Sequence, residues 1–86
     1  MTRPPKPPRS PERGRPAVPA TVVLGANVRE ARQRAGLTQV ELAQRAGLAQ
    51  PAISLIELGQ ANPTVQTLQQ IADALGCPLA DLLKAD

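Results

Sequence analysis

The stretch that decides the fold is residues 37–59, LTQVELAQRAGLAQPAISLIELG. Thr38 and Glu41 form a T-x-x-E capping box, in which each side chain can accept a hydrogen bond from the other residue's backbone amide. This box predicts a helix directly after Thr38. A second short helix is expected over 50–58, with Pro51 in its first turn, the part of a helix that tolerates proline.

Further helices are expected on both sides of this pair, separated by glycines. Apolar residues at helical spacing predict one helix over 24–35 and another over 65–75, the latter capped by Thr64. A last short helix is expected over 78–83. The predicted inward-facing residues are Leu24, Val28, Ala31, Ala35, Leu42, Ala43, Ala46, Ile53, Ile56, Val65, Leu68, Ile71, Ala72 and Leu75. The fold class is therefore all-α, a compact domain of five helices.

The composition excludes several classes of protein. The 86 residues include no His, Phe, Trp or Tyr and one cysteine, Cys77. A zinc finger, a Cys/His or Ser-His-Asp catalytic set and an intrachain disulfide cannot be assembled from them. The missing aromatic rings argue against the stacking surfaces of single-strand nucleic-acid-binding modules. No pair of titratable groups has a catalytic spacing, so we expect neither an enzyme nor a bound cofactor or metal.

Prolines and charge divide the chain near residue 20. Residues 1–20 hold seven of the ten prolines and five basic residues against Glu12, a net charge of +4, whereas residues 21–86 carry −1. Residues 1–20 contain too few apolar residues for their burial to offset the conformational entropy lost on ordering. We therefore expect a disordered, Pro-rich basic tail over 1–20 and a folded domain over 21–86. The formal charge of +3 is therefore the sum of a +4 tail and a −1 domain.

No apolar run approaches the roughly 20 residues of a membrane span. Basic residues precede the apolar stretch 17–26, as in a signal peptide, but Pro19 interrupts it and an arginine-rich segment follows. We therefore expect a cytoplasmic protein without membrane association, with Cys77 reduced.

Two helices of about eight residues joined by a short turn are typical of the helix-turn-helix motif, whose second helix enters the DNA major groove. The chain resembles the Cro/C1-type (XRE-like) helix-turn-helix proteins over about residues 24–83. The resemblance implies a lambda-repressor-like fold and a small, repressor-like bacterial transcriptional regulator that binds double-stranded DNA as a homodimer. The matching residues are Leu37-Thr38-Gln39, Glu41-Leu42-Ala43, Gly47, Ile53-Ser54, Ile56-Glu57, Gly59, Pro63, Leu68 and Ala72-Asp73-Ala74-Leu75-Gly76.

The resemblance also implies roles for single residues. Gln39 matches the glutamine that bonds a phosphate oxygen in the family, and the positive start of a helix suits an anion. The alternative is an exposed, helix-forming glutamine. Arg32 and Glu57 match the pair that bridges the first helix to the end of the third, and their alternative is two separate surface charges.

On the third helix, the positions that match base-reading or phosphate-facing residues of the family are Gln50, Pro51, Ser54 and Leu55. The Gln50 amide can both donate to and accept from the major-groove edge of adenine. Ser54 can donate to a base or a phosphate. Leu55 either covers a thymine methyl or borders the core, and Pro51 supplies no donor.

The third helix carries no cation, although cations at phosphates supply most of the affinity for nucleic acid. Ala49 also stands where the family prefers a Ser or Thr cap, at a cost of about 1 kcal/mol. The tail can supply the missing charge, with Arg9, Arg13 and Arg15 as phosphate contacts along the backbone or in a minor groove. The alternative interpretations of the tail are a solubilising extension, a segment added by an upstream start codon, or a PxxP ligand for an SH3-like partner.

Two other functions stay open beside the regulator. One is an antitoxin that binds DNA and also a toxin protein. The other is a protein-binding adaptor that has lost most DNA contact and shows no salt-dependent DNA affinity. Leu58, Leu79, Leu82 and Leu83 are candidates for the homodimer surface, although core packing also explains most of these leucines.

Overall fold

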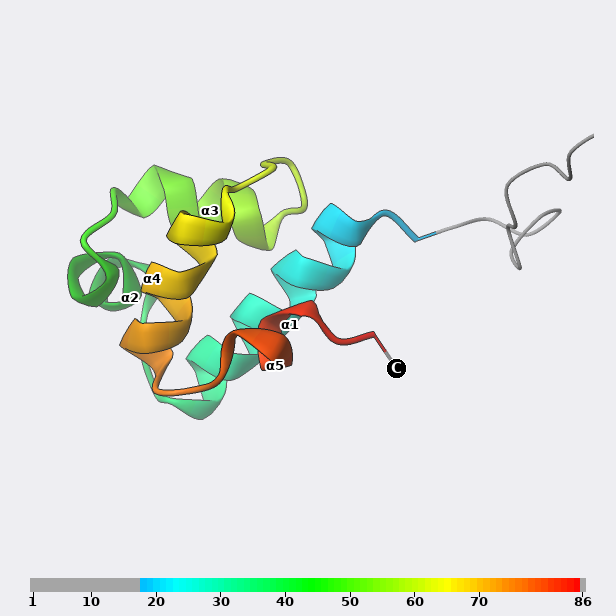
Figure 1. Ribbon diagram of the computed structural model, residues 1–86. Coiled ribbons are helices and arrows are strands. Elements are labelled where there is room, and N and C mark those ends of the chain that lie inside the picture. Colours follow the sequence, from blue (N-terminus) through cyan, green and yellow to red (C-terminus); the bar gives the residue numbers. More distant parts are fainter. Residues whose placement is uncertain (1–17, 86) are drawn as a thin grey trace, which may run out of the picture.

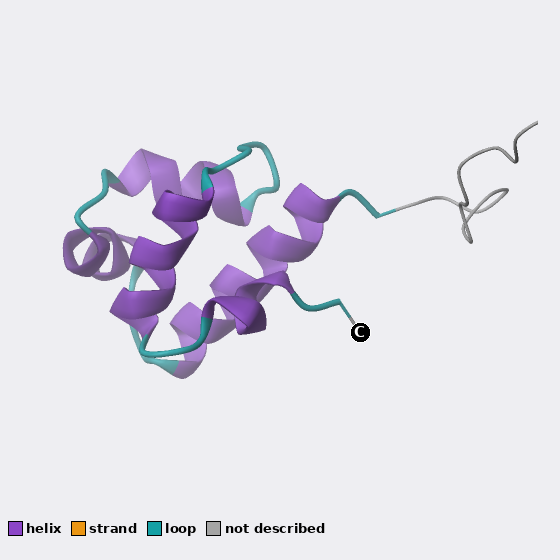
Figure 2. Cartoon of the chain, viewed as in Figure 1, coloured by secondary structure: helices purple, strands orange, loops and turns teal. Residues whose placement is uncertain are grey.

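The computed structural model describes residues 18–85, which form five helices and no strand (Figures 1 and 2). They are α1 (Ala20–Arg34), α2 (Gln39–Ala46), α3 (Gln50–Glu57), α4 (Val65–Leu75) and α5 (Leu79–Leu83). The predicted all-α fold of five helices is confirmed. Helix α1 begins at Ala20, one residue before the predicted start of the folded domain. Residues 1–17 of the predicted disordered tail, which include the candidate contacts Arg9, Arg13 and Arg15, lie outside the described residues.

Local sequence signals set the helix ends. The Glu41 amide donates to Thr38 Oγ1 at 3.0 Å and the Thr38 amide donates to Glu41 Oε1 at 2.8 Å, so the predicted capping box is confirmed. Thr64 caps α4 by accepting from the Thr67 amide at 3.1 Å. Helix α3 starts after Ala49, which provides no side-chain cap. The four glycines predicted to end helices have left-handed φ angles of 71° to 75°.

The core lies where the five helices meet, and no polar or charged residue within residues 18–85 is buried as a whole residue. Helix α1 packs against α3 and α5, while α2 packs against α3 and α4 (Figure 1). Burying one aliphatic side chain stabilises the fold by about 1.5–3 kcal/mol. The buried hydrophobic residues are Leu24, Val28, Leu37, Leu42, Ala43, Ala46, Ile53, Ile56, Leu68, Ile71, Ala72 and Leu82.

Two predicted core residues were wrong. Ala35 is the exposed C-cap of α1, and Val65, the first residue of α4, is 68% exposed. Both lie at helix ends, where the chain has packed neighbours on one side only. The helical spacing was right, but periodicity alone does not show where a helix extends beyond its neighbours.

Helix α1 approaches the end of α3 closely at Gly25, which is a buried residue of α1. A Cβ atom at this position would lie 2.8 Å from the Glu57 carbonyl oxygen and would also overlap the carbonyl oxygen of Ile56. Only a residue without a side chain permits this contact. Gly25 thus sets how closely the last turn of α3 packs on α1.

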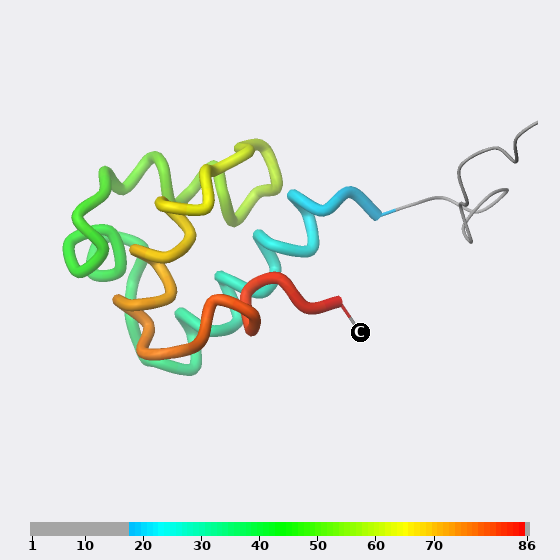
Figure 3. The backbone as a smooth tube through the Cα atoms, viewed as in Figure 1, coloured from blue at the N-terminus to red at the C-terminus, as the bar shows by residue number. Residues whose placement is uncertain are grey.

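Asn27 holds the C-terminal segment against α1. Its Nδ2 donates to the carbonyl oxygens of Leu82, at 2.9 Å, and of Lys84, at 2.7 Å. Figure 3 shows the end of the chain returning to the side of the molecule where α1 begins.

None of the helices within residues 18–85 combines the length and the apolar character that a bilayer crossing requires.

Candidate nucleic-acid interface

Helices α2 and α3 form a compact pair joined by three residues, from Gly47 to Ala49. The Leu48 amide donates to the Ala43 carbonyl oxygen at 2.9 Å, which closes the turn. Ala43 on α2 and Ile53 on α3 are both buried in the same core. The short connection and the shared core fix the orientation of α3 relative to α2.

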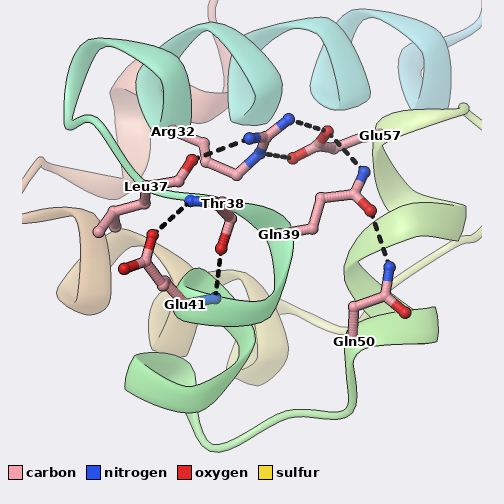
Figure 4. A network of polar contacts seen from close by, with 7 residues as sticks. All are labelled: Arg32, Leu37, Thr38, Gln39, Glu41, Gln50 and Glu57. Carbon is pink, nitrogen blue, oxygen red and sulfur yellow. Dashed lines mark hydrogen bonds and ion pairs between the residues drawn. The ribbon is translucent and has the colours of Figure 1, made fainter.

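Arg32 and Glu57, which the family resemblance paired and which could also have been two separate surface charges, lie in contact (Figure 4). Arg32 Nε donates to Glu57 Oε2 at 2.6 Å and Arg32 Nη2 donates to Glu57 Oε1 at 3.0 Å. These two bonds fix the guanidinium plane relative to the carboxylate plane. A third bond runs from Nη1 to the Leu37 carbonyl oxygen at 2.9 Å. The side chains are only 12% and 4% exposed, respectively. Hydrogen bonding to Glu57 raises the pKa of Arg32. The two hydrogen bonds between these side chains tie α1 to the end of α3.

Gln39 and Gln50 extend this ion pair towards the surface. Gln39 Nε2 donates to Glu57 Oε1 at 3.1 Å, and Gln50 Nε2 donates to Gln39 Oε1 at 2.8 Å. Figure 4 shows the resulting chain of side chains, which runs from α1 through the end of α3 and the start of α2 to the start of α3. The Arg32-to-Gln50 network therefore joins three helices, and both glutamine side chains have defined orientations. No sequence pattern indicated that these two glutamines meet.

The other predicted site residues lie along α3. Pro51 and Leu55 are exposed, Leu55 by 44%, and Ser54 is partly buried. Within residues 18–85 the Ser54 hydroxyl makes no side-chain hydrogen bond, so it is available as a donor. Of the predicted contacts, the structure brings together Gln39, Gln50 and Ser54, because Gln39 bonds Gln50 and lines one hollow with Ser54. Leu58, a candidate for the dimer surface, is 63% exposed, whereas Leu82 is fully buried.

Sequence reasoning missed one cation beside this surface. A hollow of about 230 Å³ is lined by Arg29, Arg32, Gln39, Ser54, Glu57 and Leu58. Arg29 stands one helical turn before Arg32 on α1, a spacing that puts both on one face. That spacing was visible in the sequence and was the one signal that pointed to Arg29.

A small all-helical core that carries two short helices on a three-residue turn, with polar side chains along the second, defines a helix-turn-helix protein. The chain belongs to this family, because the family model HTH_3, described as helix-turn-helix, matches residues 28–82. The resemblance stated from the sequence is thereby confirmed.

Individual relatives agree with the family. The chain is 41% identical over 61 residues to an uncharacterized HTH-type transcriptional regulator, y4dJ, of Sinorhizobium fredii. This match covers 71% of this chain and 79% of that protein. It is 32% identical to the immunity repressor protein of Bacillus phage phi105 over 72% of this chain, but spans only 43% of the repressor. The crystal structure of the restriction-modification controller protein C.AhdI from Aeromonas hydrophila superimposes with a TM-score of 0.71 at 32% identity, covering 72% of this chain and 94% of that one.

Proposed function

We propose that this chain regulates transcription by binding double-stranded DNA sequence-specifically, with α3 in the major groove. The chain belongs to the helix-turn-helix family, and relatives that it resembles are named transcriptional regulators or a repressor. The observation that carries the proposal is the 2.8 Å hydrogen bond between Gln50 and Gln39, because it presents an oriented amide at the first residue of α3. The name of the phage relative supports a repressor-like role.

The bond from Gln50 to Gln39 leaves groups for base readout. The Gln50 amide has two hydrogens, of which one goes to Gln39, and its oxygen accepts no hydrogen bond from residues 18–85. The second hydrogen can bond adenine N7 while the oxygen accepts from adenine N6, the two-bond pairing that recognises this base in the major groove. Gln39 stands at the positive start of α2 and has a second amide hydrogen for a backbone phosphate. Ser54 and Leu55, further along α3, contact a phosphate or base and a thymine methyl, respectively.

Fluorescence anisotropy with genomic duplex fragments at several salt concentrations tests the proposal. After a preferred site is found, Gln50→Ala should weaken binding to it by about 1–3 kcal/mol, and binding to unrelated duplex much less. Gln44→Ala, an exposed glutamine elsewhere on α2, is the matched control and should bind like wild type. If the wild-type protein binds no duplex at low salt, the proposed function is wrong.

The proposal includes a homodimer in the cytoplasm, where such a regulator meets DNA. Two copies present two α3 helices to successive major grooves of a pseudo-palindromic site. Exposed Leu58 and Leu83 are the candidate contacts between copies. Sedimentation with and without duplex measures the stoichiometry, and one copy per site would exclude this part of the proposal.

A pull-down that recovers a protein partner but no DNA would favour the adaptor, whereas a toxin recovered together with DNA would favour the antitoxin.

A further inference from the structure

We propose that Arg29, Gln39 and Ser54 form an anion site at the edge of the interface, and that Arg29 is the cation that holds a phosphate of the DNA backbone there. The inference rests on the proposed function, since it assigns the ligand of this hollow to the same duplex. It adds a residue on α1 to an interface otherwise formed by α2 and α3. It also identifies a source of positive charge for an interface whose central helix has none.

The hollow described above joins three elements at one point. Arg29 comes from the middle of α1, Gln39 from the first residue of α2 and Ser54 from α3, and all three line the same volume of about 230 Å³. A hollow of this size has room for a tetrahedral oxyanion. The three side chains offer a guanidinium, an amide and a hydroxyl, all of which donate hydrogen bonds to phosphate oxygens.

Charge compensation singles out Arg29 among the cations around this hollow. Arg32 also lines it, but its charge is taken up by the two hydrogen bonds to Glu57. In the part of the chain that the structure describes, no carboxylate oxygen lies within 4.0 Å of the Arg29 guanidinium, whereas Arg34 on the same helix pairs with Glu30 at 3.5 Å. The Arg29 guanidinium is thus exposed, has no acidic partner among these residues and lies beside two further hydrogen-bond donors. Such an arrangement is suited to binding a phosphate.

The start of α2 adds to the positive potential. The first backbone amides of a helix have no partner within the helix, and they carry the positive end of its dipole. In α2 the capping box occupies the Glu41 amide with Thr38 Oγ1, which leaves the amides of Gln39 and Val40 without a hydrogen bond inside residues 18–85. The Glu41 carboxylate accepts from the Thr38 amide. The anion site thus combines a full charge on α1 with partial charges at the start of α2.

The slope of binding against salt tests the site, because each phosphate contact contributes about 0.9 to the slope of log K against log salt. Arg29→Gln should flatten that slope by about one contact and weaken binding to specific and unrelated duplexes by the same factor. Arg29→Lys keeps the charge and should restore most of the slope. The matched control is Arg34→Gln, which removes an exposed arginine of α1 that is paired with Glu30 and does not line the hollow.

Thermal unfolding of each variant keeps the result interpretable. Because Arg29 is exposed and makes no ion pair within residues 18–85, Arg29→Gln should unfold at the wild-type temperature, so its loss of binding reports the missing charge. If the wild type binds duplex but Arg29→Gln has the same salt slope as Arg34→Gln, the anion site is overturned and the proposed function stands. If the wild type binds no duplex at low salt, the proposed function fails and the anion site fails with it.

Discussion

Replacing Gly25 by alanine should destabilise the protein, although alanine is the better helix former. A Cβ atom at residue 25 would lie 2.8 Å from the Glu57 carbonyl oxygen and overlap that of Ile56, and both are backbone atoms that cannot rotate away. Relieving the overlap requires the end of α3 to move away from α1. Such overpacking typically costs about 1–3 kcal/mol, while alanine recovers about 1 kcal/mol of helix propensity. Because the overlap is severe, we expect a net loss of about 2 kcal/mol.

Urea unfolding followed by circular dichroism measures this difference in the free energy of unfolding. The control is Ala26→Gly, at the next position of α1, which measures the glycine penalty in this helix at an exposed residue. That variant should lose about 1 kcal/mol. If Gly25→Ala instead gained about what Ala26→Gly loses, helix propensity alone would govern residue 25, and the close approach of α1 and α3 would have no energetic importance.

Three further predictions concern the ion pair, the core and the capping box. Arg32→Ala leaves the Glu57 carboxylate buried and without its cation, so it should lower the free energy of unfolding by about 3–5 kcal/mol in urea, while replacing both residues by apolar ones should cost much less. Leu82→Ala should cost about 2–5 kcal/mol in the same assay because this side chain is fully buried; a smaller loss would show that α5 contributes little to the core. Hydrogen bonds from Thr38 lower the pKa of Glu41 below its unfolded value of about 4.3. The ionised Glu41 side chain therefore stabilises the fold above about pH 4.3, and this stabilisation is lost as the pH falls through the pKa of Glu41 in the folded state. The stability difference between wild type and Glu41→Ala should therefore narrow between pH 7 and pH 3, and a constant difference would contradict this origin.

Local chemistry explains why so much of the fold could be predicted. The Thr38 and Glu41 box, the Thr64 cap and the glycine stops act over three or four residues, so the sequence contains all the information that sets them. Apolar periodicity likewise located most of the core. It was wrong at Ala35 and Val65, because the burial of helix ends depends on where neighbouring helices stop.

The site depended more on contacts between distant segments. The individual residues Gln39 and Gln50 could be taken from the resemblance, but their hydrogen bond spans eleven positions and follows from the packing of α2 on α3. Gly25 had no sequence signal at all, since its importance comes from the carbonyl groups of another helix. Arg29 had only its spacing from Arg32, and the hollow that gives this spacing meaning exists only in the folded chain.

The Arg32-to-Gln50 network has a consequence for the timing of DNA recognition. Because Glu57 holds Gln39 and Gln39 holds Gln50, the rotamer of the amide that we propose reads a base is selected when the domain folds, before any duplex is present. Little side-chain freedom then remains to be lost on contact with DNA. Weakening the buried end of the network would let Gln50 sample several directions, so the protein would still bind DNA through its phosphate contacts while losing its preference among base sequences.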